Sequence, residues 1–144
     1  MKIVNKKAYF NFSVEKHYDA GIMLLGSEVK SMRNKDIDFS DSYIVINNGE
    51  LFLKGMRIAP YKNATFNNHP EHRDRKLLLK KSEIVQILKR YDEKGIAVLP
   101  LEIFMMNNKF KLKIGVCKGK RQFDKRNEIR EREVKIDIAR KYNI

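Results

Sequence analysis

The chain has 144 residues, of which 42% are hydrophobic and 34% charged, and its formal net charge is +13. This length and composition favour one folded domain over a disordered chain, and the charge predicts a polyanionic partner, either nucleic acid or an anionic membrane surface. No apolar run is long enough for a signal peptide or a membrane span, and a lone cysteine excludes an internal disulfide framework, so we expect a cytoplasmic protein.

The first half of the chain predicts four strands. Apolar and polar residues alternate over residues 8–14, which is typical of a half-buried strand. The short apolar run 22–25 predicts a second strand, and Ser27 is a plausible N-cap for a helical turn in SEVKSMR. Two alternating runs flank Asn48-Gly49, whose tolerance of positive φ suits a type I′ turn, so residues 42–56 should form a hairpin.

The second half predicts a loop, a helix and two more strands. The polar stretch from residue 60 to about residue 75 has no lasting period and is expected to be a loop. SEIVQILKRYDEKG has a period near 3.6, with Ser82 able to cap its start and Gly95 suited to its end. Alternation then predicts strands over 96–105 and 110–116, with Lys111 and Lys113 facing outward.

These elements predict a mainly β fold. Six strands with short turns and one helix favour a small antiparallel OB-like barrel, with the packed helix closing one end. An open α+β sheet is the alternative. We expect the barrel to occupy residues 1–121 and a basic tail to occupy residues 122–144, although a fold alone does not establish a function.

No pattern in the sequence predicts an enzyme active site. His69 and His72 lie three residues apart, but the intervening Pro70 argues against a helical pair of metal ligands and favours solvated loop histidines. The acidic string KDIDFSD lacks the glycine and final glutamate of a calcium loop, and no phosphate-binding glycine loop or nucleophile elbow occurs. We therefore expect no catalysis, no metal and no cofactor, and Cys117 fits a small buried residue.

Two basic segments favour nucleic acid as the partner. HRDRKLLLKK, residues 72–81, combines five cationic side chains with three leucines, so apolar anchoring and cationic reach occur together. In CKGKRQFDKR, Gly119 permits close approach of a backbone between cationic neighbours. With the lysines of the last predicted strand, these segments suit phosphate binding, whereas the alternative is a set of exposed cationic faces with no partner.

The C-terminal residues predict a tail that becomes ordered on a partner. Acidic and basic residues alternate at helical i, i+4 spacing, for example Glu128 with Arg132 and Glu131 with Lys135. The apolar residues between them form too ragged a stripe to dock a helix firmly on a core. A polyanionic groove or channel is therefore the expected partner of the tail.

Four strings of this sequence resemble, in order and spacing, the small protein B family, the SsrA-binding proteins of bacterial trans-translation: DAGIMLLGSEVKSMR, SDSYIVINNGELFL, RDRKLLLKKSEI and GVCKGKRQFDKRNEIRERE. The resemblance implies an OB-like barrel that binds the tRNA-like domain of transfer-messenger RNA (tmRNA). It also implies a tail that becomes helical in the empty messenger channel of a stalled ribosome. The implied role is not enzymatic: alanyl-tmRNA is delivered with elongation factor Tu to ribosomes that lack a codon in the decoding site.

The resemblance implies RNA contacts at Asp19, Leu78, Lys80 and Gly119. The family usually has glutamate at the position of Asp19 and histidine or asparagine at that of Lys80, so this chain departs from the pattern at both. With the neighbouring basic residues included, the expected tmRNA-binding set is Asp19, Arg75, Lys76, Leu78, Lys80, Lys118, Gly119 and Lys120.

For the ribosome, the resemblance implies contacts from the tail. The motif Asp124-Lys125-Arg126 resembles the family's DKR, and the family tends to have a longer basic C-terminus than the ARKYNI found here. The expected ribosome-binding residues are Asp124, Lys125, Arg126, Arg130, Arg132 and Lys135. We expect a monomer. The rival functions are a nucleic-acid chaperone with no preferred RNA and an RNA-modifying enzyme.

Overall fold

The computed structural model describes residues 2–39, 41–62 and 68–120, so the predicted tail lies outside the described residues. The elements are β1 (Lys2–Val4), α1 (Lys6–Asn11), β2 (Phe12–Ile22), α2 (Gly26–Arg33), β3 (Ile37–Asp38), β4 (Tyr43–Asn47), β5 (Glu50–Lys54), β6 (Arg57–Ile58), β7 (Arg75–Leu78), α3 (Lys81–Tyr91), β8 (Ile96–Met106) and β9 (Lys109–Gly119). Among the described residues, no helix has the length and apolar character needed to cross a membrane.

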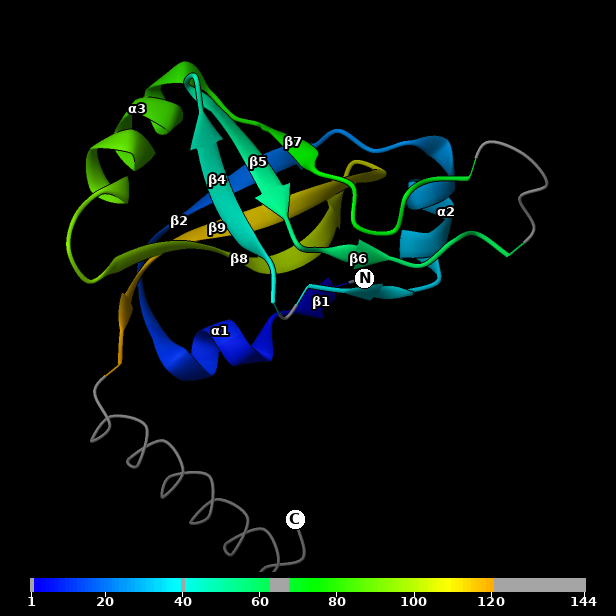
Figure 1. Ribbon diagram of the computed structural model, residues 1–144, viewed down its shortest axis with the longest axis horizontal. Helices are drawn as coiled ribbons and strands as arrows, with labels where there is room; N and C mark the ends of the chain where they lie inside the picture. Colours follow the sequence, from blue (N-terminus) through cyan, green and yellow to red (C-terminus); the bar gives the residue numbers. More distant parts are fainter. Residues whose placement is uncertain (1, 40, 63–67, 121–144) are drawn as a thin grey trace, which may run out of the picture.

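Seven of the strands form one curved antiparallel sheet in the order β1-β8-β9-β2-β7-β5-β4, and β3 pairs with β6 in a separate ladder. The β4–β5 hairpin crosses over β8 and β9, and β4 comes back against β8 without pairing with it (Figure 1). The sheet is thus curled into a partly open barrel. In the same view α3 and α2 lie at opposite ends of the sheet and α1 lies below it (Figure 1). The predicted OB-like, mainly β fold is confirmed.

The main core fills the inside of this barrel. Side chains alternate along β2 and β9, so Tyr18 and Ala20 point inward beside Leu112 and Ile114. Ile87, on the inner face of α3, is buried in the same core. Removing these apolar surfaces from water is the main force that holds the barrel together.

The N-terminal strand prediction is wrong for residues 8–11, which belong to α1, and is confirmed for residues 12–14, which begin β2. Asn5 precedes this helix, and its Oδ1 accepts a hydrogen bond from the Ala8 N–H at 3.3 Å. Ala8 then packs with Leu101 and Cys117 in a second, smaller core outside the barrel. The apolar alternation that begins at residue 8 thus belongs partly to a helix.

The predicted strand at residues 22–25 is also wrong. Ile22 is the last residue of one long strand, β2, which replaces both predicted strands. Gly21 does not end this strand, because it pairs with Lys111 on one side and Leu78 on the other. β2 therefore lies in the middle of the sheet, with a partner along each edge.

The other predicted elements are confirmed, with different ends. The hairpin turns at Asn48 and Gly49, which both have positive φ, at 50° and 75°. The predicted helix is α3, but Ser82 does not cap it; the helix starts after Lys80, whose N–H donates to Glu83 Oε1 at 3.1 Å. β8 and β9 are joined through Asn107-Asn108 and each has 11 residues. The described part of the region between β6 and β7 contains no helix or strand.

Position 115 on β9 has no room for a larger side chain, because Leu101 and Cys117 of the second core pack closely against Gly115. A Cβ at this position would lie 2.5 Å from Leu101 Cδ1 and 2.9 Å from Cys117 Sγ. We expect Gly115→Ala to lower the free energy of unfolding by about 1–3 kcal/mol, measured by urea denaturation. Gly119→Ala is the matched control on the same strand, because nothing lies within 4 Å of its added Cβ. Equal stability of the two variants would show that Leu101 moves aside at no cost.

Candidate nucleic-acid interface

The strand register brings several predicted contact residues together on the outside of the barrel. Asp19 on β2 lies opposite Lys113 on β9, and Gly21 lies between Lys111 and Leu78. Because side chains alternate along a strand, these residues face outward where their neighbours face the core. We call this surface the outer patch; it comprises Asp19, Gly21, Leu78, Lys80, Lys111 and Lys113.

The centre of the outer patch is apolar. The Leu78 residue is 51% exposed, which is unusual for a leucine in the middle of a sheet. Gly21 leaves room for it, since a Cβ added to Gly21 would lie 3.3 Å from Leu78 Cβ. A groove of about 350 Å³ runs beside the two residues and is bordered by Lys109 and Lys111. The patch thus offers an apolar surface to a base or ribose, with ammonium groups within reach of its phosphates.

Lys80 and Lys76 each lie two residues from Leu78, at the apolar centre of the patch. β7 runs antiparallel to β2, so the chain beyond Leu78 continues toward the level of Asp19 before α3 begins. The side chain of Lys80 is exposed, and no salt bridge is formed by it among residues 2–39, 41–62 and 68–120. Lys76, by contrast, has its Nζ 3.2 Å from Glu50 Oε1. An anionic ligand would meet less competition at Lys80 than at Lys76.

Glu102 lies at the edge of the outer patch and holds Lys113. Its Oε2 lies 3.5 Å from Lys113 Nζ and 3.4 Å from Lys2 Nζ, and its Oε1 accepts a hydrogen bond from the Tyr9 hydroxyl at 2.9 Å. Burial alone would raise the pKa of Glu102, but Tyr9 and the two lysines outweigh burial and lower it. Burial and the bond to Glu102 raise the pKa of Tyr9 to about 12. Lys113 is therefore partly neutralised at neutral pH, and Lys111 and Lys80 supply more of the charge.

The prediction that Arg75 contacts RNA is wrong, because its side chain is fully buried. Its guanidinium lies 2.6 Å from Glu28 Oε2 and also donates to the carbonyl oxygens of Met56, at 2.7 Å, and Glu71, at 3.2 Å. Because the whole guanidinium is buried, a ligand in solution cannot reach it. The alternation of side chains along a strand could have predicted this burial. Arg75 and Leu77 lie two residues apart on β7, so both face the interior.

The predicted residues Lys118, Gly119 and Lys120 lie at the other end of β9, beside the start of β2. Gly119 is six residues from Lys113, which at about 3.3 Å per residue places it roughly 20 Å from the outer patch. Gly119 is exposed, and Lys120 donates from Nζ to the Tyr9 carbonyl oxygen at 3.0 Å. We call these three residues the strand-end group. Apart from the buried Arg75, the residues of the expected tmRNA-binding set thus lie in two places, on or next to β2 and β7 and at the end of β9.

The sequence model of the SmpB protein family matches residues 2–144. The chain belongs to the SmpB family. The SsrA-binding protein of Persephonella marina is 44% identical over 96% of this chain and 91% of its own length. That of Aquifex aeolicus is 44% identical over 96% and 88%. A chain of the solved structure "tmRNA-SmpB: a journey to the center of the bacterial ribosome" is 35% identical, with a TM-score of 0.70, and the match covers 90% of this chain and 94% of that one.

The histidines of this SmpB family member differ from the prediction in one respect. His69 is buried: its Nδ1 lies 2.8 Å from Ser27 Oγ and its Nε2 lies 3.0 Å from the Ile58 carbonyl oxygen. Ser27 is thus part of a contact between α2 and β6, and it does not cap α2, which begins after Leu25. His72 is exposed, as predicted. The described part of the chain has no group of three or more side chains that could hold a metal ion.

Two further predictions concern Cys117 and the tail. Cys117 is buried as predicted, and burial raises the pKa of its thiol to about 11, so it is not a reactive thiolate. Gly21 and Glu102 were not predicted as parts of the site, because their importance depends on which strands pair. The predicted ribosome-binding residues Asp124, Lys125, Arg126, Arg130, Arg132 and Lys135 lie outside the described residues.

Proposed function

We propose that this protein binds the tRNA-like domain of tmRNA and brings it to stalled ribosomes, where trans-translation tags the incomplete peptide and releases the ribosome. The observation that carries the proposal is the outer patch, where the exposed Leu78 lies over Gly21 among lysines. The names of the relatives and of the solved structure support the same function. The protein acts by binding, without catalysis, as a monomer in the cytoplasm.

The residues of the outer patch have distinct roles in this proposal. Lys80 and Lys111 contact phosphates, which fix the position of the RNA without reading its sequence. Leu78 packs against an exposed base or ribose. Asp19 accepts hydrogen bonds from a base amino group or from a 2′-hydroxyl, and only the 2′-hydroxyl distinguishes RNA from DNA. Its carboxylate is exposed, so accepting such bonds requires little rearrangement of the barrel.

A second segment acts on the ribosome. The strand-end group is the last described part of the chain before residues 122–144. In the proposal these residues form a basic tail that enters the empty mRNA channel, and Asp124-Lys125-Arg126 lies near the decoding site. Elongation factor Tu takes part only indirectly, through alanyl-tmRNA. The barrel and the tail thus have different RNA partners.

Replacing Lys80 with alanine tests the role of the outer patch. We expect weaker tmRNA binding and a salt dependence of log K that is flatter by about 1, because one fewer phosphate is neutralised. Affinity is measured by filter binding over a series of salt concentrations. Lys94→Ala is the control, since Lys94 is an exposed lysine in the turn before β8. An unchanged slope for Lys80→Ala would remove this residue from the phosphate contacts, and complete competition by bulk tRNA would favour an unselective RNA chaperone.

A further inference from the structure

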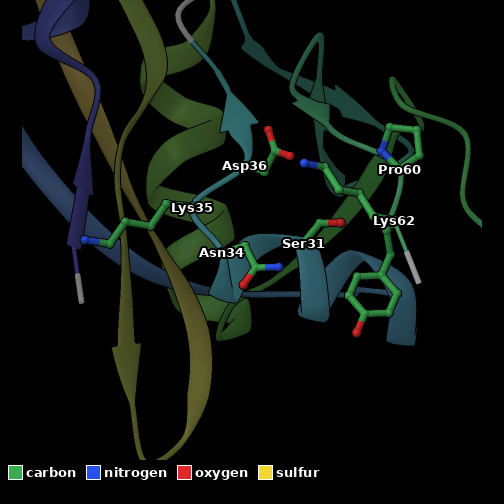
Figure 2. A pocket seen from close by; sticks show the side chains of 7 residues that line it. Ser31, Asn34, Lys35, Asp36, Pro60 and Lys62 are labelled. Carbon is green, nitrogen blue, oxygen red and sulfur yellow. The ribbon is translucent and has the colours of Figure 1, made fainter. Parts of the chain in front are cut away.

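A second hollow, of about 390 Å³, lies at the C-terminal end of α2 and shares no residue with the outer patch. We call it the α2 pocket. Figure 2 shows Ser31, Asn34 and Asp36, from the last turn of α2 and the residues after it, across from Pro60 and Lys62. Lys62 extends toward Asp36, whereas the Lys35 side chain points away from them (Figure 2). The pocket is therefore formed by two segments that meet beside the short β3–β6 ladder.

The walls of the α2 pocket are held by hydrogen bonds. Ser31 Oγ donates to the Ala59 carbonyl oxygen at 2.7 Å, and the N–H of Ala59 donates to the carbonyl oxygen of Asp36 at 3.0 Å. The Asn68 side chain exchanges two hydrogen bonds with the backbone of Tyr61, both at 3.2 Å. The site is thus formed before any ligand arrives, which reduces the entropy lost on binding.

The α2 pocket combines an aromatic ring, polar side chains and cations. Tyr61 lines it, and Lys30 Nζ lies 5.2 Å from the centre of the Tyr61 ring. Asn34 and Asp36 offer amide and carboxylate groups. Neither Lys30 nor Lys62 forms a salt bridge with any carboxylate in the described part of the chain. These two ammonium groups remain available to phosphate, as does that of Lys80 in the outer patch.

We propose that the α2 pocket binds an unstacked base of RNA. Proteins recognise single-stranded RNA by stacking bases on aromatic side chains and by hydrogen bonds to the base edges. The base lies against Tyr61, its edge meets Asn34 and Asp36, and its phosphate lies near Lys30 and Lys62. Guanine is the preferred base, because its N1–H and amino group present two adjacent donors to one carboxylate. The inference rests on the proposed function only in that the partner is RNA.

The test uses the full-length protein and a fluorescein-labelled single-stranded oligonucleotide, UUUGUUU, with UUUUUUU as its partner probe. We expect Tyr61→Ala to weaken binding of UUUGUUU by about 5- to 150-fold, since stacking of one base contributes about 1–3 kcal/mol. Tyr61→Phe keeps the ring and should stay close to wild type. Asp36→Asn should remove the preference for UUUGUUU over UUUUUUU. Melting temperatures of all variants confirm that each is folded.

Two controls separate this inference from the proposed function. Lys80→Ala should weaken tmRNA binding but keep the preference for UUUGUUU over UUUUUUU, because Lys80 does not line the α2 pocket. If wild-type protein does not bind tmRNA, the proposed function fails while the pocket is still tested by the oligonucleotides. If tmRNA binds normally but UUUGUUU does not bind, or binds equally well to wild type and Tyr61→Ala, the inference is overturned.

Discussion

Replacing Glu28 with alanine is expected to lower the free energy of unfolding by about 3–5 kcal/mol, because a buried charge network loses its only carboxylate. The Glu28 side chain is fully buried, and its oxygens lie 2.6 Å from the guanidinium groups of both Arg73 and Arg75. Its Oε1 also accepts the N–H of Leu25 at 2.8 Å. The variant leaves Arg75 buried without its counter-charge. Urea denaturation followed by circular dichroism measures the effect.

The matched control for this prediction is an exposed glutamate. The Glu50 side chain is 50% exposed and forms a salt bridge with Lys76. Glu50→Ala removes this bridge and should change the free energy of unfolding by less than about 1 kcal/mol. A similar small effect for Glu28→Ala would mean that water or a rearranged carbonyl replaces the carboxylate.

The same network predicts a dependence of stability on pH. Burial alone would raise the pKa of Glu28, but hydrogen bonds from Arg73, the Leu25 N–H and Arg75 outweigh it, so the pKa lies below its ordinary value. A carboxyl with a lowered folded pKa stabilises the protein above its unfolded pKa of about 4.3, and this contribution is lost as pH falls through the folded value. The stability difference between wild type and Glu28→Gln should therefore shrink in acid.

Deleting residues 124–144 is expected to abolish peptide tagging on stalled ribosomes while leaving tmRNA binding nearly intact. The reason is the division of contacts, since the outer patch and the strand-end group both remain in the shortened chain. A reconstituted translation reaction on a messenger without a stop codon measures tagging, and filter binding measures tmRNA affinity. Loss of both activities would contradict the division into a barrel and a tail.

A substitution control guards against an effect of length alone. A full-length variant in which Lys125 and Arg126 are both replaced by glutamine keeps the chain length and removes two positive charges. It should bind tmRNA like wild type and tag poorly, because weaker electrostatic contact with ribosomal RNA affects only the second partner. Normal tagging by this variant would exclude these two side chains from the ribosome contact.

The barrel could be predicted from the sequence because local signals and the final fold agree in most of it. Asn48-Gly49 fixes a hairpin through its own backbone preferences, and the period of α3 matches the face that it buries. The N-terminus misled prediction, because the alternation of residues 8–14 resembles a strand. What selects a helix there is contact with Leu101 and Cys117, which are distant in the chain.

The site could be predicted only in part, for the same physical reason. Leu78 and Lys80 stand out in a basic segment, but burial decides that Arg75, two positions before an inward leucine, is structural. The contribution of Gly21 depends on pairing between β2 and β7, which the sequence does not reveal. His69 shows the same limit, since its partners come from α2 and β6.

β9 carries Lys111 and Lys113 of the outer patch near one end and Lys118 and Gly119 of the strand-end group at the other, so the strand sets the distance between the two groups. The strand is paired along both of its edges, and Gly115 at its middle is locked beneath Leu101, so it has little freedom to bend. An RNA held at one end of β9 therefore sets where the following residues start in space. If residues 122–144 form the tail proposed above, its starting direction depends on the barrel, and a change in the length of β9 would alter that direction even if every proposed RNA contact were kept.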